Sequence, residues 1–482
     1  MLFNSYEYIF FFLPLVYFIY FYLNKRHFTE GSKAFLVVSS LFFYGWWNIA
    51  YIPIILLSMI FNYIVGVYIS SGKSKNINRF LFAVGIIFNL LLLGYFKYAD
   101  FLIENINFSL GSNIDYLNIA LPLAISFFTF QQIAYLVDTY KNEVQEHDFL
   151  NYAIFVTFFP QLIAGPIVHH KEMMPQFASK RNKIIQYKNI SLGIFVFSIG
   201  LFKKVIIADT FAVWASNGFD KAEFLTFFEA WAVSFSYTFQ IYFDFSGYTD
   251  MAIGAALLFN IRLPINFNSP YKALNIQDFW RRWHITLSRF LRDYIYIPLG
   301  GNRNGDMSTS LNLFATFLLG GIWHGAGWTF ILWGMLHAFA VVIHRIYNKL
   351  NFSMNKVLAW IITFNFINIT WIFFRAEDIN SALKVLRGLV GLDGFTLHPY
   401  LENRLSFLSL YGIEFKVWLT LFEPKKFILI LLISFLMIFI KNSGELQKNF
   451  RPNLISLFFV IGLLSYSILN ISNYSDFLYF DF

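Results

Sequence analysis

The feature that most constrains this 482-residue chain is a succession of apolar runs along almost its whole length. Most runs approach the roughly 20 residues that an α-helix needs to cross a bilayer. Only 13% of the residues are charged and the mean hydropathy is +0.56, so we predict an all-α polytopic membrane protein. The runs lie at 8–23, 34–48, 51–70, 80–97, 118–138, 150–168, 189–215, 224–245, 250–262, 311–323, 328–346, 356–374, 427–441 and 453–470.

The domain organisation predicted from these runs is simple. The sequence contains neither an internal repeat nor a low-complexity linker, so we expect one integral membrane domain over 1–482 with about 10–12 transmembrane helices. The N-terminal helices occupy 1–97 and the C-terminal helices occupy 427–470. Lys25 and Arg26 follow the first run, which indicates a retained helix with the N-terminus outside.

Composition excludes several classes of function. The chain has no cysteine, which rules out disulfides, a cysteine nucleophile and a thiolate metal site. Its net charge of +8 comes from basic residues in short loops beside apolar runs, as expected for cytoplasmic loops against membrane lipids. We therefore expect no nucleic-acid partner.

Charge in the loops predicts one incomplete crossing. The loop at 71–79 is basic and therefore cytoplasmic, and two further crossings bring 139–149 to the same side. A third crossing would put 169–188 outside, although that loop is strongly basic. The segment "FPQLIAGPI" (159–167) contains two prolines and a glycine, and broken backbone is tolerated at membrane depth only when protein or a wet cavity surrounds it. We predict a re-entrant element there.

A long amphipathic stretch covers 266–306 and contains tryptophans on one helical face and arginines largely on another. Asn275 or Asp278 is suited to cap a helix that runs to about residue 294. A basic amphipathic helix of this kind is typical of the membrane–water interface. We therefore predict an interfacial helix on the cytoplasmic side.

His324 lies in "GGIWHGAG", in the middle of an apolar segment. Ionisable side chains inside a membrane are rare and indicate function by default. Histidine suits proton transfer near neutral pH, and the flanking glycines, including Gly325, allow a ligand or another backbone to approach closely. The alternative is a neutral, buried histidine in a helix interface where small residues allow close packing.

Other histidines are weaker candidates. His284, in "RRWHITLS", is a second candidate, with a plain interfacial histidine as the alternative. His337 and His344 are seven residues apart and share a helical face, and packing explains His344. His169 and His170 are adjacent, so they point apart on a helix and we expect no metal site there.

Two carboxylates, Asp244 and Asp250, interrupt the apolar sequence "QIYFDFSGYTDMAIG". Carboxylates at membrane depth need partners, which Arg262 or an arginine of 281–292 can supply. For Asp244 the roles of proton acceptor, histidine orienter and structural ion pair all remain open. The sequence has no G-x-S-x-G elbow, Walker A loop, G-x-G-x-x-G or H-E-x-x-H motif, so a histidine acting as base toward a separate hydroxyl is the catalytic arrangement that fits.

Six ordered blocks resemble the membrane-bound O-acyltransferases, specifically the bacterial branch of alginate and peptidoglycan O-acetylation proteins. A more distant resemblance is to the teichoic-acid D-alanylation acyltransferase. The similarity extends over about 118–392. The blocks are "PLAISFFTFQQIAYLVD", "FPQLIAGPIVHH", "QIYFDFSGYTDMAIG", "LPINFNSPYKALNIQDFWRRWHITLSRFLRDYIYIPLGGNR", "GGIWHGAGWTFILWGMLHA" and "WIFFRAEDINSALKVLRGLVG".

The resemblance implies a ring of helices around a central tunnel, with His324 and His284 as the two family histidines. It implies acetyl-CoA as the donor substrate, no permanently bound cofactor, and a periplasmic SGNH-type acetyltransferase partner that acts on a polysaccharide. His324 then serves as general base or as a transient acyl carrier. Trp323 and Trp328 are expected to wall the site, with His337 in support.

The arginines of the amphipathic block are candidates for binding the donor, because guanidinium forks match phosphate geometry. Anchoring to lipid headgroups is an equal alternative. Whether the donor is free coenzyme A thioester or a carrier protein stays open. The candidate residues are Arg281, Arg282, Arg289 and Arg292.

Two other functions are consistent with part of the sequence. A transporter or channel also contains buried ionisable residues and broken helices, but it does not need the amphipathic block at 266–306. A lipid-type acyltransferase of the same fold is less consistent with "FFRAEDINSAL" and "PLGGNR". We therefore expect O-acetylation of an extracytoplasmic polysaccharide at the bacterial cytoplasmic membrane, peptidoglycan first and alginate or another secreted polysaccharide second.

Overall fold

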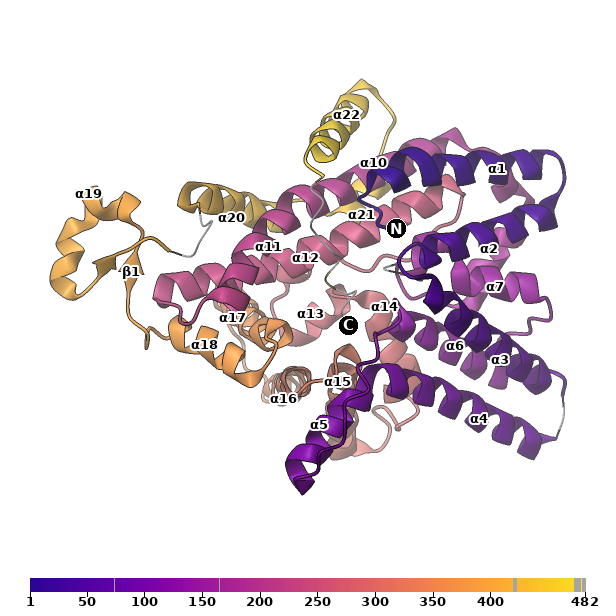
Figure 1. The fold of residues 1–482 in the computed structure, drawn as a ribbon, viewed down its shortest axis with the longest axis horizontal. Coiled ribbons are helices and arrows are strands. Elements are labelled where there is room, and N and C mark those ends of the chain that lie inside the picture. Colours follow the sequence, from indigo (N-terminus) through magenta and orange to yellow (C-terminus); the bar gives the residue numbers. More distant parts are fainter. Residues whose placement is uncertain (73, 164, 419–422, 472–477, 479–482) are drawn as a thin grey trace. The chain divides into compact units, whose positions relative to one another are not determined.

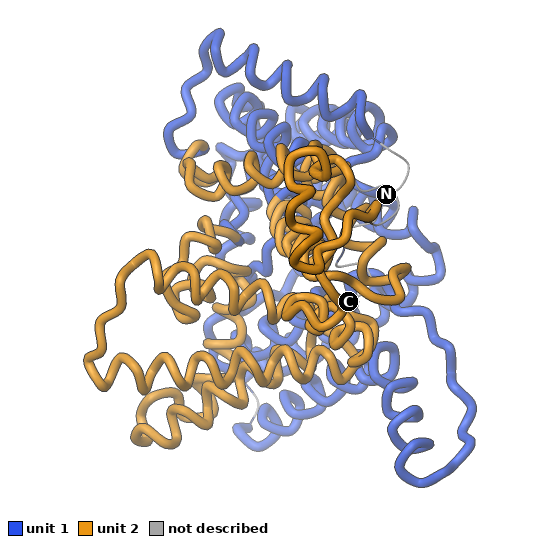
Figure 2. The backbone as a smooth tube through the Cα atoms, turned by 90° about the vertical axis from the view of Figure 1, so that its left-hand side faces the viewer, with its two compact units in different colours: residues 1–202, 247–266, 447–482 blue, residues 203–246, 267–446 orange. Residues whose placement is uncertain are grey.

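The computed structural model describes residues 1–72, 74–163, 165–418, 423–471 and 478. Those residues are overwhelmingly helical, and their sheet structure is one parallel pair of two-residue strands (Figure 1). The all-α prediction is therefore confirmed. The chain divides into two compact units, each assembled from segments far apart in sequence (Figure 2). Unit 1 contains 1–202, 247–266 and 447–482, and unit 2 contains 203–246 and 267–446.

Unit 1 holds the N-terminal helices and the end of the chain. Its elements are η1 (Glu7–Phe12), α1 (Leu13–Lys25), α2 (Thr29–Gly45), η2 (Ile49–Tyr51), α3 (Ile52–Ser70), α4 (Lys75–Leu93), η3 (Gly94–Tyr98), α5 (Ala99–Leu110), α6 (Ile125–Tyr140), α7 (Phe149–Thr157), α8 (Phe159–Leu162), α9 (His170–Ala178), η4 (Lys180–Lys183), α10 (Tyr187–Phe202) and α22 (Leu454–Leu469).

Unit 2 holds most of the predicted site residues. Its elements are η5 (Lys203–Ala208), α11 (Asp209–Ser216), η6 (Asn217–Lys221), η7 (Pro270–Lys272), α13 (Ile276–Arg282), α14 (Ile285–Leu291), η8 (Arg292–Tyr296), α15 (Gly305–His324), α16 (Trp328–Lys349), α17 (Lys356–Arg375), α18 (Ile379–Leu389), β1 (Thr396–Leu397), η9 (Pro399–Leu401), α19 (Glu402–Leu405), η10 (Ser406–Tyr411), β2 (Glu414–Phe415) and α20 (Pro424–Phe439). Two helices contribute residues to both units: α12 (Phe227–Leu258) and α21 (Ser443–Lys448).

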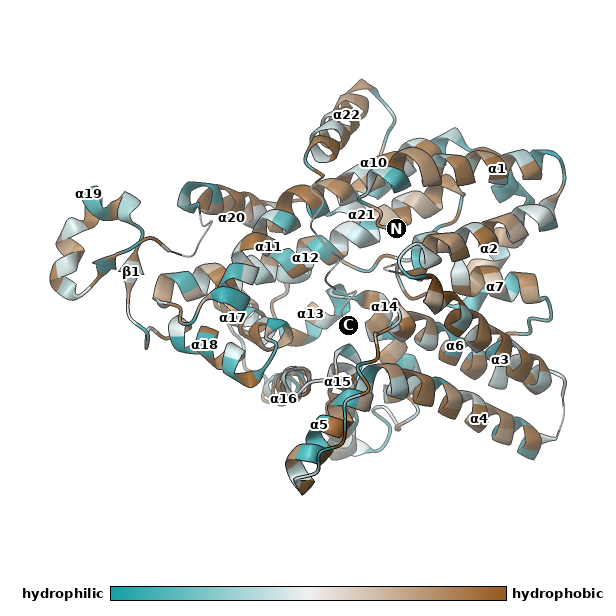
Figure 3. Cartoon of the chain, viewed as in Figure 1, coloured by the Kyte–Doolittle hydropathy of each residue, from teal (hydrophilic) through white to brown (hydrophobic). Residues whose placement is uncertain are grey.

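Six helical segments of the described chain are long and apolar enough to cross a membrane. The sequence-based number is higher because it included shorter apolar helices, such as α20 and α22. The apolar character is plain in α3 and α4, which are hydrophobic along most of their length (Figure 3). The six segments are Glu7–Lys25, Ile49–Ser70, Lys75–Leu110, Tyr187–Lys221, Trp328–Lys349 and Lys356–Arg375.

Buried amides hold three helices of unit 1 together. Asn62 on α3 and Asn89 on α4 are both fully buried, and Asn89 Nδ2 donates to Asn62 Oδ1 over 2.6 Å. Gln132 on α6 accepts hydrogen bonds through Oε1 from Asn62 and, over 2.8 Å, from Ser58 Oγ. Helices surrounded by lipid have no hydrophobic driving force for association, so such polar contacts specify which helices pack together.

The predicted re-entrant segment, 159–167, begins with α8 and closely follows α7. α7 has nine residues, a length of about 14 Å, too short for the ~30 Å hydrocarbon core. Ala164 of the predicted segment lies outside the described residues. Beyond it, the chain returns to the start of α7, because His170 Nε2 lies 3.2 Å from Glu146 Oε2 and Lys171 Nζ lies 2.5 Å from Glu143 Oε2. The loops before α7 and after α8 therefore contact each other, which is the arrangement expected of a re-entrant element.

The closest packing in unit 2 joins α15 to α16. The two helices form a hairpin across the short connection 325–327, and Gly321 faces Gly334 at their crossing. A Cβ on Gly321 would lie 2.6 Å from the carbonyl oxygen of Phe330 and 2.8 Å from the Cα of Gly334. Both neighbours are backbone atoms, so no side-chain rotation relieves the overlap.

We predict that Gly321→Ala destabilises the protein by about 1–3 kcal/mol, because overpacked backbones must separate. The matched control is Gly462→Ala in α22, where a Cβ meets no described atom within 4 Å. The control should keep or slightly raise stability, since alanine favours helices. Thermal unfolding of the purified proteins in detergent measures both changes, and an unchanged Gly321→Ala midpoint would contradict the packing described.

Candidate functional site

His324 is the last residue of α15, and its side chain is buried at 3% exposure. The ring lies 4.9 Å from Trp323, 5.1 Å from Trp333 and 5.1 Å from Phe374, measured between centroids. The helix ends here because the chain becomes extended at Gly325, where the ring of Phe330 occupies the place of a side chain. An ionisable group is therefore held in an aromatic environment at the turn of the hairpin.

Trp328, predicted to wall this site, has a side chain that is 55% exposed. The aromatic residues around His324 include Trp323, which the sequence suggested, and also Trp333 and Phe374. The latter two come from neighbouring helices, and sequence adjacency to His324 could not indicate them.

His337 is fully buried on α16, four residues after Trp333, and their rings are 4.7 Å apart. The indole Nε1 of Trp280 donates a hydrogen bond of 3.2 Å to His337 Nδ1. Because Nδ1 accepts this bond, the ring proton of the neutral imidazole resides on Nε2. Trp333 therefore links His324 on one side to His337 on the other, within a continuous row of rings.

His284 occupies an unusual backbone conformation. The predicted helix from Asn275 to about residue 294 is wrong: α13 ends at Arg282 and α14 begins at Ile285. Asn275 does cap α13, accepting a hydrogen bond of 2.7 Å from the backbone N–H of Asp278. His284 between the two helices has a left-handed φ of 42°, which costs free energy for a residue with a Cβ.

The His284 side chain is fully buried, with its ring 4.7 Å from that of Phe245. Burial lowers the pKa of His284 to about 3, so the imidazole is neutral at physiological pH. A neutral imidazole can donate one hydrogen bond and accept one. Strained backbone of this kind is concentrated at functional sites.

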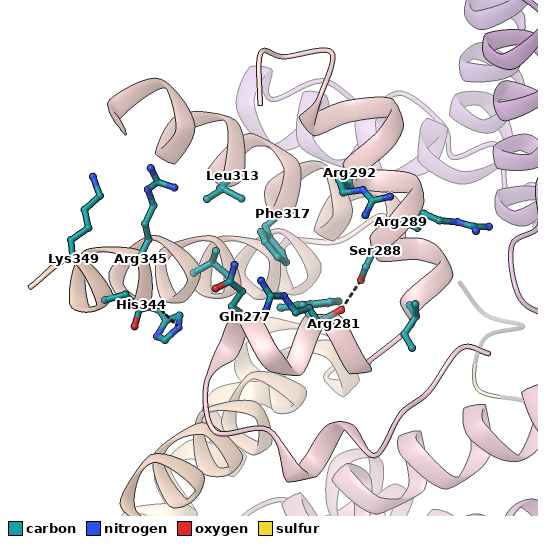
Figure 4. Close-up of a pocket in the computed structure, with 14 residues that line it drawn as sticks. Gln277, Arg281, Ser288, Arg289, Arg292, Leu313, Phe317, His344, Arg345 and Lys349 are labelled. Carbon is teal, nitrogen blue, oxygen red and sulfur yellow. Dashed lines mark hydrogen bonds between the residues drawn. The ribbon is translucent and has the colours of Figure 1, made fainter. Parts of the chain in front are cut away.

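A cavity of about 840 Å³ lies between α13, α14, α15 and α16 (Figure 4). Arg281, Arg289 and Arg292, three of the residues predicted as candidates for donor binding, line it. Arg282 is not among the lining residues and instead pairs with Asp278 at 2.9 Å. Three of the four predicted arginines are thus brought together.

The end of α16 supplies cations that the sequence did not indicate. Arg345 and Lys349 line the same cavity and extend from one side of the helix, with His344 below them in the view of Figure 4. Their spacing of four residues puts them on one helical face. From sequence alone, a basic end on an apolar helix is explained by membrane topology, and only the packing of α13 against α16 gives it another meaning.

Trp280 forms the inner wall of the cavity. It lines the cavity while its ring lies 5.1 Å from His337 and 5.7 Å from Trp333. On the cavity side it also contacts Phe317, at 5.2 Å. One indole therefore separates the cationic cavity from the row of rings that ends at His324.

Asp244 forms a buried ion triad with groups that the sequence did not suggest. Lys204 Nζ lies 2.6 Å from Asp244 Oδ1 and 2.9 Å from Asp209 Oδ1. The side chains of Lys204 and Asp244 are 3% and 1% exposed. The predicted partner was Arg262 or an arginine of 281–292, whereas the observed partner is a lysine from the π-helical turn η5.

A polytopic membrane chain with a buried histidine behind a cationic cavity is suited to transfer a group from an anionic donor. The family model "MBOAT, membrane-bound O-acyltransferase family" matches residues 123–381. This chain belongs to the membrane-bound O-acyltransferase family, and it is an acyltransferase.

Three relatives span a range of similarity. The "Peptidoglycan O-acetyltransferase" of Helicobacter pylori is 50% identical over 100% of this chain and 98% of that protein. The "Probable alginate O-acetylase AlgI" of Pseudomonas aeruginosa is 39% identical over 86% of this chain and 78% of that protein. The "Teichoic acid D-alanyltransferase" of Bacillus subtilis is 26% identical over 54% of this chain and 69% of that protein.

We predict that Lys204→Met destabilises the fold by about 3–5 kcal/mol, because it removes a buried cation that pairs with two carboxylates. Adding Asp244→Asn to that variant should recover part of the loss. The control is Lys171→Met, since the Lys171–Glu143 pair is about half exposed and contributes at most ~1 kcal/mol. Thermal unfolding in detergent compares the variants. A stable Lys204→Met protein would mean that the triad does not support the fold.

Proposed function

We propose that this chain takes an acetyl group from acetyl-CoA at the cytoplasmic face and passes it outward for O-acetylation of peptidoglycan. The observation that supports acyl transfer is a row of contacting rings that leads from the cationic cavity to His324. Trp280 lines the cavity and contacts Trp333, and Trp333 contacts His324. The observation that favours peptidoglycan is the full-length, 50% identity to the Helicobacter pylori protein of that name.

The cavity fits the anionic part of a coenzyme A thioester. Five cationic side chains surround a volume of about 840 Å³, and arginine forks bind phosphate oxygens in pairs. Apolar groups between the cations, including Leu313 and Phe317, suit the less polar arm of such a donor (Figure 4). The thioester end then points toward Trp280 and must pass this indole to approach His324.

At His324 the neutral imidazole accepts the proton of an acceptor hydroxyl while the hydroxyl oxygen attacks the thioester carbonyl. The new carbon–oxygen bond forms, the carbon–sulfur bond breaks, and the departing thiolate takes up a proton. General base catalysis of this kind typically contributes about 10²–10⁴-fold. A second route, in which His324 carries the acetyl group briefly, requires the same placement of the ring.

The other two histidines have supporting roles in this proposal. His284 is neutral and donates a hydrogen bond to the thioester carbonyl, where negative charge develops. His337 holds the Trp280 indole through its Nδ1 and so positions the inner wall of the cavity. Asp244 acts within its ion triad and not as a proton acceptor.

The acceptor side completes the assignment. The chain lies in the bacterial cytoplasmic membrane with its N-terminus outside, and the hydroxyl comes from the serine of a periplasmic SGNH-type acetyltransferase partner. That partner delivers the acetyl group to the polysaccharide. Alginate or another secreted polysaccharide is the second candidate acceptor, favoured by the 39% identity to the Pseudomonas aeruginosa protein.

We predict that His324→Ala removes ester-linked acetate from one polymer of the cell, because the base that activates the acceptor is lost. Acetate released by mild alkali is measured separately from purified peptidoglycan and from secreted polysaccharide, at matched membrane levels of the protein. His147→Ala, at an exposed loop position, is the control. Loss from peptidoglycan alone supports the first acceptor, loss from secreted polysaccharide supports the second, and retention in both contradicts acyl transfer through His324.

We also predict that Arg281→Gln weakens coenzyme A binding by about tenfold or more, since a charge-assisted hydrogen bond contributes roughly 1.5–3 kcal/mol. The neighbouring Arg282→Gln is the matched control, because Arg282 pairs with Asp278 outside the cavity. Isothermal titration calorimetry on the purified protein measures both affinities. Equal losses in the two variants would indicate a general charge effect and not a phosphate site in the cavity.

A further inference from the structure

Two cations of the cavity are held by an acid outside its lining. Arg345 Nη2 lies 2.6 Å from Asp306 Oδ1, and Lys349 Nζ contacts Asp306 Oδ2. Asp306 lies in the first turn of α15, and it is not among the residues that line the cavity. Hydrogen bonds from Lys349 and Arg345 lower the pKa of Asp306, so the acid is a carboxylate at physiological pH. Asp306 therefore neutralises two of the cations that line the cavity.

The triad is accessible to solvent. The side chain of Asp306 is 68% exposed, that of Lys349 is 48% exposed and that of Arg345 is 29% exposed. Exposed ion pairs are weak, because water and dissolved ions compete for both partners. An incoming anion can take the place of the carboxylate without entering a closed space.

The other cations of the cavity differ in their partners. Arg292 pairs at 2.7 Å with Asp293, the next residue in the chain. Arg281 is exposed and forms no ion pair with any described residue. A ligand phosphate can therefore bind Arg281 directly, whereas at Arg345 and Lys349 it must displace Asp306.

We propose that Asp306 is a placeholder anion, which binds Arg345 and Lys349 until a ligand anion displaces it. The need for this displacement makes the donor site selective for a phosphomonoester. A carboxylate and a phosphodiester each carry one negative charge, so a diester has no charge advantage over Asp306. A phosphomonoester carries about −1.5 to −2 at pH 7 and offers three oxygens to the two cations. This inference rests on the proposed donor site, and it assigns the donor as a free nucleotide thioester with a phosphomonoester. A thioester on a carrier-protein arm, which has only a diester, lacks this advantage and is the disfavoured donor.

Asp306 is far from the reacting groups along the same helix. It lies in the first turn of α15 and His324 is the last residue, a separation of about 27 Å at 1.5 Å per residue. A change at Asp306 therefore alters the capture of the donor and leaves the environment of His324 unchanged. This separation allows binding to be tested without the chemical step.

The test uses the purified full chain in detergent, with coenzyme A and 3′-dephospho-coenzyme A as calorimetric probes. Both probes carry the same diphosphate, so the ratio of their affinities reports the contribution of the 3′-phosphomonoester alone. For the native chain we expect coenzyme A to bind about tenfold more tightly, the difference that one charge-assisted contact provides. In Asp306→Asn the affinity for the dephosphorylated probe rises, and the ratio falls to about threefold or less. Below pH 6 the ratio for the native chain also falls, because the monoester takes up its second proton near that pH.

Asp220→Asn is the matched control, since Asp220 forms a similar half-exposed pair with Arg375 away from the cavity. This control should keep the native ratio. The double variant Arg345→Gln/Lys349→Gln provides a second test, which stands if Asp306→Asn fails to fold. It should lose the preference for coenzyme A, because the two cations that would bind the phosphomonoester are gone.

An unchanged ratio in Asp306→Asn, or equal weakening of both probes, overturns the inference and makes Asp306 an organiser of the two cations. A native chain that binds neither probe also overturns it, together with the coenzyme A site. Polymer-bound acetate that still depends on His324 would then leave acyl transfer through His324 standing with a different donor. Conversely, the expected probe ratios together with acetate retained in His324→Ala would support the placeholder and defeat the proposed acetyl transfer.

Discussion

The contact between Gly321 and Gly334 is the constraint on which unit 2 depends. Two helix backbones meet there with no room for a Cβ, so α15 and α16 are held in one register. That register brings Trp333 against His324 and, one turn further, puts His337 in reach of Trp280. It also brings the start of α15 beside the end of α16, where Arg345 and Lys349 meet Asp306. One hairpin thus carries the cationic cavity at one end and the buried histidine at the other.

The sequence predicts the fold where a single strong physical requirement acts. Helix length against bilayer thickness predicts most of the helices, and loop charge predicts the return of the chain around α7 and α8. It fails where tertiary contacts decide between similar local structures. The runs at 224–245 and 250–262 belong largely to the single helix α12, which continues through the short polar stretch 246–249.

The break at His284 has a similar origin. No glycine or proline occurs between Asn275 and Leu291, so local preference predicts one continuous helix. The left-handed residue is instead stabilised by burial, with the His284 ring against Phe245 and Trp283 4.9 Å from Trp371. Such compensation involves residues distant in sequence. The candidate site was predictable as a set of residue types, while its arrangement and the contribution of α16 were not.

The two ion triads of unit 2 show how burial divides charges into permanent and exchangeable ones. Lys204 sits between Asp209 and Asp244 where water has almost no access, so removing any charge leaves another without solvation. Asp306 binds two cations in a similar geometry, but at the surface, where water or another anion can solvate each partner as they separate. The same chemical groups therefore fix the fold in one place and remain available to a ligand in the other. Distance from solvent, and not the identity of the residues, decides which of these two roles an ion triad has.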